Sequence, residues 1–261
     1  MKRTNPWAWL WVGLAVVYFA VPLYATLDFS LRMQRGVLGL KAYQSVIENP
    51  RFRDSFIFSF EMAIATIVLS TLLMVPTIYW VNLRLPRFRP YIEVITLLPF
   101  VIPAIVHVFG LIRTYSRPPL ALVTSPLLLV CAYVVLAFPY MYRAIDTGMR
   151  AIDIRTLTEA AQSLGAGWGT ILLQIIFPNV RVAILSGAFL TFAIVMGELT
   201  LALYLAWPTF GPFMYQIGQN RAYEPAALAI LSFAMTWISI GLIQLIGRGP
   251  RSQQIPLGGA R

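Results

Sequence analysis

The apolar residues of this chain form long uninterrupted blocks, and polar residues are gathered in the short stretches between them. Each block is close to the roughly 20 residues that a helix needs to cross a bilayer. The pattern therefore predicts an all-α integral membrane protein, with a single transmembrane domain over residues 1–261. The six predicted spans are residues 7–27, 55–81, 94–112, 118–142, 182–207 and 225–247.

The first block follows Lys2 and Arg3, an arrangement that a secretory signal peptide would also show. No small-residue cleavage site and no soluble domain come after it, so we interpret it as the first transmembrane helix. Residues 28–54 are expected to form an external loop with room for a short surface helix. Within the third block, Pro99 and Pro103 remove backbone donors and predict a bend or break.

The basic residues lie mainly between the blocks, and their distribution predicts that both termini are cytoplasmic. Of the 20 basic residues, twelve fall inside and eight outside in this topology, five of the eight in the long first loop, so the inverted orientation stays open. The twelve residues assigned to the inside are Lys2, Arg3, Arg84, Arg87, Arg89, Arg143, Arg150, Arg155, Arg181, Arg248, Arg251 and Arg261.

Composition agrees with a membrane protein, because 59% of the residues are hydrophobic and 11% are charged, whereas soluble domains carry about 25% charged residues. The net charge of +10 could suggest nucleic acid. No basic face with interleaved aromatics occurs, so contacts with lipid headgroups are expected instead. The single cysteine, Cys131, excludes an internal disulfide and is expected to pack within its span. His107 has no second ligand at helical spacing, so no metal site is predicted.

The longest cytoplasmic segment, residues 143–177, contains two helical stretches around a glycine-rich turn. Thr156 and Glu159 have the spacing of a capping box, which predicts a helix start at Thr156. Gly165 and the two glycines shortly after it allow a sharp turn, and Pro178 is expected to end the second helix. Small alanines on the first helix favour a docking element for another protein. A helix that lies on the membrane surface is the alternative that this pattern leaves open.

The same segment carries a more specific pattern. Glu159-Ala160-Ala161 is followed after three residues by Gly165, and nine residues later come Ile175, one residue, and Phe177-Pro178. This resembles the EAA loop of ABC importer permeases, in which Leu-Pro stands where this chain has Phe177-Pro178. The position of the motif, between the fourth and fifth predicted spans, also resembles that family.

The resemblance implies a type I importer permease with six helices per subunit and a cytoplasmic coupling helix. Its expected partners are two cytoplasmic ATPase subunits, a second permease subunit that is a related but different chain, an extracytoplasmic substrate-binding protein and membrane lipid. The expected location is the bacterial cytoplasmic (inner) membrane. On this reading the ATPase-coupling residues are Glu159, Ala160, Ala161, Leu164 and Gly165.

The chain has no phosphate-binding Gly-x-x-x-x-Gly-Lys-Ser/Thr motif. It is therefore expected to be a non-catalytic subunit without a cofactor of its own, with ATP and Mg bound by the partner ATPase. A secondary transporter or a channel would leave the EAA-like loop unexplained. A membrane-embedded enzyme would need a cluster of catalytic groups that the spans do not contain.

The cargo is suggested by the last third of the chain. Gly197-Glu198-Leu199-Thr200, Thr209-Phe210, Gln219, Ala226 and Phe233 resemble the spermidine/putrescine-type permeases. A polyamine is therefore the expected solute, and this resemblance is what favours a second permease subunit that is a different chain. Relatives of that group that carry phosphonates, opines, iron or amino-acid-like compounds are the alternative.

A physical argument points to the same region, because an ionisable group inside a span is costly unless it faces a cavity or a partner. Glu198 is such a group, and a cationic amine could pair with it; a structural carboxylate is the alternative. Trp207, Phe210 and Tyr215 could contact the alkyl chain through their ring faces or form an interfacial aromatic belt. These four residues are the predicted substrate pathway.

Overall fold

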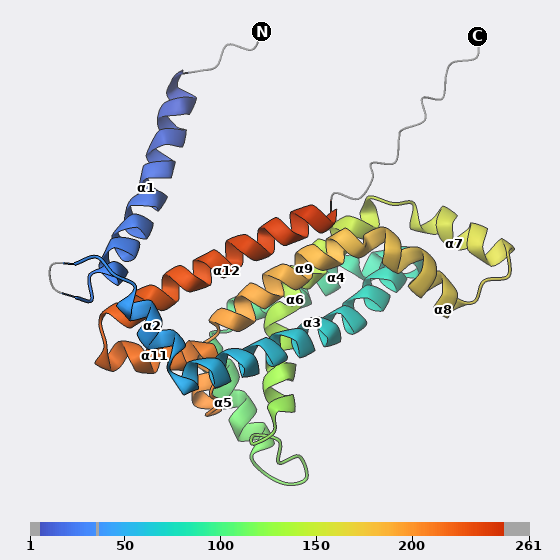
Figure 1. Ribbon diagram of the computed structural model, residues 1–261. Coiled ribbons are helices and arrows are strands. Elements are labelled where there is room, and N and C mark those ends of the chain that lie inside the picture. Colours follow the sequence, from blue (N-terminus) through green and yellow to red (C-terminus); the bar gives the residue numbers. More distant parts are fainter. Residues whose placement is uncertain (1–5, 35–36, 248–261) are drawn as a thin grey trace.

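The computed structural model describes residues 6–34 and 37–247, and these form helices joined by short loops (Figure 1). The basic residues at positions 2, 3, 248, 251 and 261, on which part of the topology prediction rests, lie outside the described residues. The described elements are α1 (Pro6–Leu31), α2 (Lys41–Ile47), α3 (Pro50–Arg84), η1 (Pro86–Phe88), α4 (Arg89–Val101), α5 (Ala104–Tyr115), α6 (Pro126–Arg150), α7 (Ile154–Ser163), α8 (Trp168–Thr170), η2 (Ile171–Ile176), α9 (Phe177–Gly197), α10 (Thr200–Tyr204), α11 (Phe210–Asn220) and α12 (Tyr223–Gly247).

Three long helices, α3, α6 and α9, pack against one another and form the core. The buried residues near α7 include Tyr79 from α3, Met141 and Ile145 from α6, and Ile184 from α9. A second cluster, centred on Leu129 and its neighbours, fills the opposite end. The core helices therefore form the rigid part on which the remaining elements are placed.

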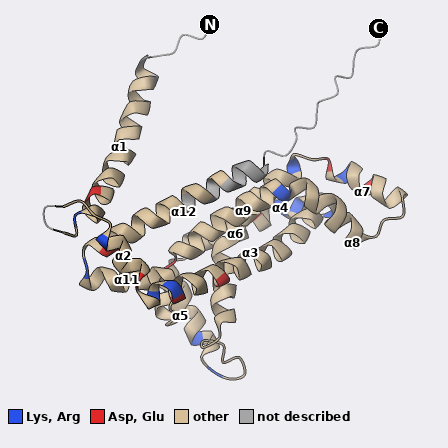
Figure 2. Ribbon diagram, in the orientation of Figure 1, with Lys and Arg blue, Asp and Glu red and all other residues tan. Residues whose placement is uncertain are grey.

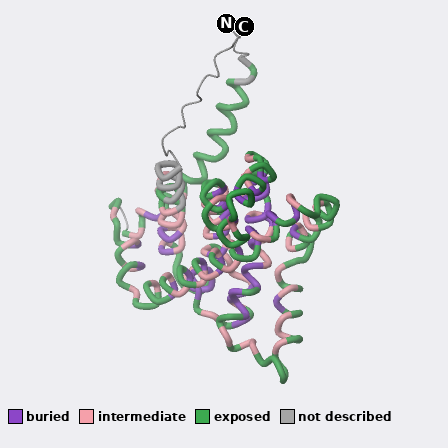
Figure 3. The backbone as a smooth tube through the Cα atoms, turned by 90° about the vertical axis from the view of Figure 1, so that its right-hand side faces the viewer, coloured by how far each residue is buried: buried purple, intermediate pink, exposed green. Residues whose placement is uncertain are grey.

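Among the described helices, α1, α3, α6 and the continuous helix from Trp168 to Gly197 are long and apolar enough to cross a membrane, and a bent pair could provide a fifth span. The described residues thus show four or five such helices. The sixth predicted span, residues 225–247, coincides with α12. Helix α1 stands apart from the core and packs on α12 and α2. The tube that leads to the N-terminus is almost wholly exposed in Figure 3, so its apolar surface needs lipid or another chain as its solvent.

The third predicted span, residues 94–112, is not one helix. Helices α4 and α5 meet at an angle of 97°, and Pro103 stands at the N-cap of α5. The N–H of Ile102 still bonds to the carbonyl of Leu98, whereas Pro103 has no N–H with which to continue the series. Proline chemistry thus explains a break where the sequence predicted a bend or a break.

Helix α6, which corresponds to the fourth predicted span, begins at Pro126 rather than near residue 118 and runs on to Arg150. Its start is defined by Ser125, whose hydroxyl accepts a hydrogen bond from the N–H of Leu127, and by proline at the first position, where a missing N–H costs nothing. The expectation that Cys131 packs inside its span is wrong, because this thiol is exposed on α6.

The helix that includes the fifth predicted span also has different bounds. It begins at Trp168, passes through the π-helical turns Ile171–Ile176, and ends at Gly197 instead of near residue 207. The expectation that Pro178 ends a helix is wrong. Pro178 lies in the first turn of α9, directly after the wider π-helical turns, where its missing donor is accommodated. The segment between the two long helices α6 and Trp168–Gly197 is therefore residues 151–167, shorter than the predicted residues 143–177.

Charged residues are gathered at the two ends of the helices and are sparse between them (Figure 2). We call the end formed by η1, α7 and α8 the α7 end, and the end formed by α2, α10 and α11 the opposite end. Charges at both ends of the helices, with few charges between them, are the arrangement that a bilayer requires.

Candidate functional site

Helix α7 is held on the core by buried residues from its own sequence. The hydroxyl of Thr158 lies 2.9 Å from the phenolic oxygen of the buried Tyr79 on α3 and also donates to the carbonyl of Ile154. Ile154 and Ala161 are buried in the core cluster at the α7 end. Motion of α7 is therefore mechanically linked to α3 and to the end of α6.

The opposite face of α7 is exposed, and it contains most of the predicted coupling residues. Glu159 and Ala160 are exposed, and Leu164 at the end of the helix is 89% exposed. Gly165 has a φ of +79°, a left-handed conformation that glycine adopts without strain. Ala161 differs from the other four because it faces the core. We call Glu159, Ala160, Leu164 and Gly165 the α7 surface.

The predicted capping box is wrong in its position. The N-cap of α7 is Asp153, so the helix begins at Ile154, before Thr156. Oxygen atoms of the Asp153 carboxylate accept hydrogen bonds from the Thr156 hydroxyl at 2.7 Å and from its backbone N–H at 3.1 Å. These two bonds hold the pKa of the Asp153 carboxyl below its ordinary value. Glu159 instead lies 3.9 Å from the guanidinium of Arg155, with both side chains exposed.

The chain after the glycine turn is anchored by a stack of aromatic and cationic groups. The rings of Trp80 on α3 and Trp168 on α8 have centroids 4.8 Å apart. The guanidinium of Arg84 lies 5.6 Å from the first ring centroid and 5.4 Å from the second. Such cation–π contacts are worth about 0.5–1 kcal/mol at exposed sites. The segment from α7 to α8 therefore contacts α3 at both of its ends, through Thr158 on Tyr79 and through Trp168 on Trp80.

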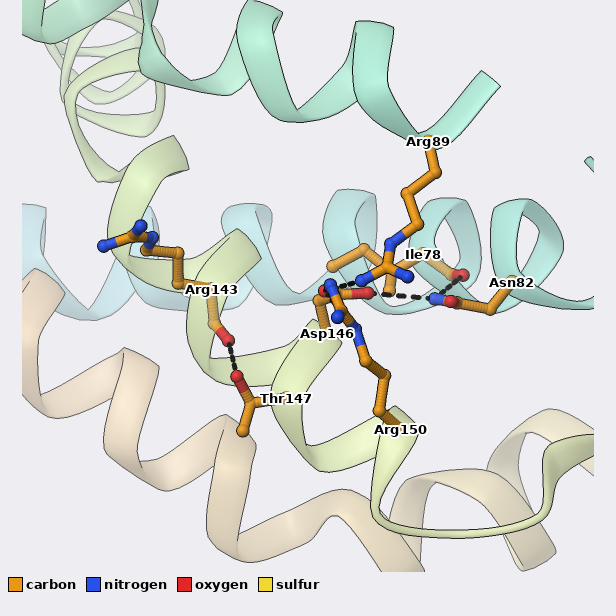
Figure 4. Close-up of polar contacts among 7 residues, drawn as sticks. All are labelled: Ile78, Asn82, Arg89, Arg143, Asp146, Thr147 and Arg150. Carbon is orange, nitrogen blue, oxygen red and sulfur yellow. Dashed lines mark hydrogen bonds and ion pairs between the residues drawn. The ribbon is translucent and has the colours of Figure 1, made fainter. Parts of the chain in front are cut away.

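A buried acid ties three helices together beside α7. The side chain of Asp146 on α6 accepts hydrogen bonds from Arg89 of α4 at 2.9 Å, from Arg150 of α6 at 2.9 Å and from Asn82 of α3 at 3.2 Å. Figure 4 shows these three side chains converging on Asp146, while the guanidinium of Arg143 points away from it. We call Asn82, Arg89, Asp146 and Arg150 the Asp146 cluster.

Glu198, the acid predicted to face the solute, lies between α9 and α10 rather than in the middle of a span. One of its carboxylate oxygens accepts a hydrogen bond from the N–H of Leu201 at 2.8 Å and the other from that of Ala202 at 3.1 Å. A side chain on Gly211 would overlap the backbone carbonyl of Glu198, so α11 crosses this break in close contact. The structure thus shows a carboxylate that accepts hydrogen bonds from the first turn of α10.

The predicted aromatic residues do not form one lining with Glu198. Trp207 stacks on Phe58 at a centroid distance of 5.6 Å. Phe210 is buried, and its N–H donates to the hydroxyl of Ser59 at 2.7 Å. Tyr215 is 47% exposed on α11. Two of the three rings therefore pack the opposite end of the bundle.

Sequence reasoning missed the Asp146 cluster and the Tyr79–Thr158 contact. Asp146 and Arg150 stand four residues apart, a spacing that indicates an ion pair on one helix face. Arg89 is 57 positions from Asp146 and Tyr79 is 79 positions from Thr158, so only the tertiary structure brings them together.

A bundle of apolar helices with a broken third span and a short helix exposed at one end is the arrangement expected of a membrane permease. Comparison with known families agrees: residues 86–249 match the family described as "binding-protein-dependent transport system inner membrane component". The chain belongs to this family, and it is a permease subunit of an ABC importer, a multi-pass protein of the inner membrane.

Its sequence relatives are named for molybdenum. The chain is 30% identical over 204 residues to a "probable molybdenum ABC transporter permease protein" of Haloferax volcanii, covering 72% of this chain and 74% of the relative. It is 24% identical to the "molybdenum transport system permease protein ModB" of Mycobacterium tuberculosis, covering 97% and 95%.

Solved structures show the same fold. A bacterial ABC transporter involved in the import of the acidic polysaccharide alginate has a chain with a TM-score of 0.66 and 15% identity, covering 91% of this chain and 96% of its own. An amino acid ABC transporter has a TM-score of 0.54 and 20% identity, covering 79% and 97%. The expected all-α type I permease fold is confirmed. The closer resemblance to spermidine/putrescine-type permeases is not supported, because the sequence relatives are named for molybdenum transport.

Proposed function

We propose that this permease carries a tetrahedral oxyanion of the molybdate type from a substrate-binding protein into the cytoplasm. The observation that carries the proposal is the similarity, over 97% of this chain, to a permease named for molybdenum transport. Dissolved molybdenum at neutral pH is a tetrahedral dianion. Such a cargo does not need a carboxylate in the pathway, and Glu198 already uses its carboxylate to bind two backbone N–H groups.

The α7 surface would bind a separate ATPase subunit, which binds ATP and Mg. An exposed leucine beside small residues fits a cleft of a partner protein, and burial of a leucine contributes about 1.5–3 kcal/mol. The contacts of Thr158 and Ala161 with the core would then transmit movement of α7 to α3 and α6. The importer would contain two such ATPase subunits and a second permease subunit. The reason for expecting a different second permease came from the polyamine resemblance, so a second copy of this chain fits equally well.

The cargo is tested by ATP hydrolysis of the complex in a bilayer. The complex is reconstituted with its ATPase and binding protein, and molybdate, sulfate, a phosphonate, putrescine and spermidine are titrated separately. We expect stimulation by molybdate and none by the polyamines. Stimulation by another oxyanion would keep the oxyanion class and reject molybdate, whereas stimulation by polyamines alone would reject the proposal.

The coupling role is tested with a matched pair of leucines. We expect Leu164→Ser to weaken binding of the ATPase subunit about tenfold or more, since roughly 1.4 kcal/mol corresponds to one factor of ten. Leu120→Ser, at a leucine that is 54% exposed at the opposite end, is the control. Equal binding by both variants, measured by titration of labelled ATPase, would show that the α7 surface does not carry the interaction.

A further inference from the structure

Arg143 differs from the two other arginines near the Asp146 cluster. Arg89 and Arg150 both bond to the Asp146 carboxylate. Arg143 lies less than one helical turn before Asp146 on α6, yet its guanidinium points in another direction (Figure 4). Among the described residues, no side chain forms a hydrogen bond or an ion pair with this guanidinium.

Arg143 lines a groove between α6 and α9, and it also lines a second pocket that contains Glu93 and Asp146. This groove has a volume of about 710 Å³, and Arg143 belongs to its lining. Small residues let α6 and α9 pack closely at the floor of the groove, because a side chain on Gly148 would overlap Ala183, and the lining reaches Phe100 on α4. The small lining residues are Ala144, Gly148, Ala151, Ala183 and Ser186.

Two of the three side-chain hydroxyl groups that line this groove already donate hydrogen bonds within their own helices, and the third is that of Tyr140. Thr147 donates to the carbonyl of Arg143 at 2.7 Å, and Ser186 donates to that of Val182 at 2.9 Å. The Arg143 guanidinium adds a full positive charge together with N–H donors for which the described part of the chain shows no acceptor. An arginine in a membrane-spanning helix is costly unless it faces water, a counter-charge or a headgroup.

The position of the groove suits a solute that leaves toward the α7 end. Its α9 lining extends from Asn179 to Leu190, the half of the helix that begins at the α7 end. On α6 it runs from Pro139 to Ala151, next to the start of α7. A solute in the groove would thus be close to the element that we expect to respond to the ATPase.

We propose that Arg143 and this groove form a binding site for a tetrahedral oxyanion on the cytoplasmic half of the transport path. This inference rests on the proposed function and deepens it. Guanidinium presents parallel N–H donors that match two oxygens of such an anion. The apolar walls of the groove exclude part of the water, which strengthens the attraction between the two charges. The phosphate of a lipid headgroup has the same chemistry, and the experiment distinguishes the two sources.

The test measures equilibrium binding of radioactive molybdate to the permease–ATPase complex in lipid nanodiscs, without the binding protein. We expect Arg143→Gln to weaken binding at least tenfold. Arg143→Lys, which keeps the charge and loses the planar donor pair, should weaken it less. Arg181→Gln is the matched control, because Arg181 is also exposed on a spanning helix near the α7 end but does not line the groove. Should Arg143→Gln fail to assemble, Arg143→Lys provides the comparison.

Each outcome separates the site from the cargo. Equal binding by the native complex, Arg143→Gln and Arg143→Lys would overturn the site, even if molybdate stimulates ATP hydrolysis. Binding of sulfate or phosphate but not molybdate, lost in Arg143→Gln, would keep the site and reject the proposed cargo. Nanodiscs with and without phosphatidylglycerol test the lipid source: retention of this lipid through Arg143, without binding of any free oxyanion, would overturn the proposal.

Discussion

The two ends of the helical core each contain a carboxylate, buried in the case of Asp146 and half-buried in that of Glu198, and the two are stabilised in different ways. At the α7 end, Asp146 is 4% exposed and bonds to side chains from α3, α4 and α6. At the opposite end, Glu198 bonds to backbone N–H groups of the short helix that follows it. The first acid links separate helices, whereas the second shapes a local break in the chain.

The difference shows that the role of a buried acid in a membrane protein depends on its partners rather than on burial alone. A carboxylate between two guanidinium groups is a tertiary crosslink, and its loss leaves two cations without a counter-charge. A carboxylate that accepts backbone hydrogen bonds acts as a helix cap, and its loss affects one turn. Glu198 was predicted to face the solute because it is an acid in an apolar block, yet Asp146 makes the contacts between residues farther apart in the sequence.

The largest effect is expected for Asp146→Asn, which removes the charge and retains the shape. Removing one partner of a buried ion pair costs roughly 3–5 kcal/mol. Side chains of Arg89 and Arg150 are 25% and 51% exposed, so solvent should reduce the loss to about 2 kcal/mol. The measurement is the thermal unfolding midpoint in detergent, together with ATP hydrolysis coupled to transport.

The control for this variant is Asp28→Asn. Asp28 forms an ion pair with Arg32 at 2.6 Å, but the two side chains are 31% and 62% exposed. Exposed pairs contribute little to stability, so this variant should unfold close to the native midpoint. Equal destabilisation by the two substitutions would contradict the crosslinking role of Asp146.

A smaller effect is expected for Glu198→Ala, which removes the cap of α10. Loss of a cap costs about 1 kcal/mol, and Glu198→Gln, which retains one carbonyl oxygen as acceptor, should lose roughly half of that. Transport should fall in proportion to stability in both variants. If Glu198→Gln abolished transport while its unfolding midpoint stayed native, the carboxylate would contact the solute and the comparison with Asp146 would fail.

The smallest effect concerns Asp153, an exposed acid with a capping role like that of Glu198. Because its pKa is lowered in the folded protein, its stabilising contribution is present above the ordinary value of 3.8 and is lost as the pH falls through the folded pKa. Asp153→Ala should therefore unfold below the native midpoint at neutral pH, and the gap should close in strong acid.

Asp153→Asn provides the control for this pH dependence. Asparagine caps a helix without titrating, so the midpoint of this variant should not change relative to Asp153→Ala as the pH falls. A gap between native protein and Asp153→Ala that stays constant down to about pH 2, well below the ordinary pKa of an aspartate, would contradict the predicted linkage.

Much of the fold could be predicted because a bilayer imposes a simple length rule on apolar blocks. The break at Pro103 follows from a missing donor, which is a local property of the residue. The true starts of α6 and α7 depend on the capping residues Ser125 and Asp153. Other residues nearby, such as Pro118 and Thr156, also looked like helix starts in the sequence. Pro178 was misread because the preceding π-helical turns, rather than the proline alone, decided whether the helix continued.

The sequence by itself determined that this is a membrane protein built of apolar helices, because block length is a local property of the chain, and the EAA-like motif carried the resemblance to importer permeases. Only the tertiary structure decided which charged groups meet. Arg89, Asn82 and Asp146 come from three helices, and their contacts depend on how α3, α4 and α6 pack. The same packing left the Arg143 guanidinium pointing away from Asp146 and placed Arg143 in the lining of the groove beside α9, an arrangement that no spacing along the chain encodes.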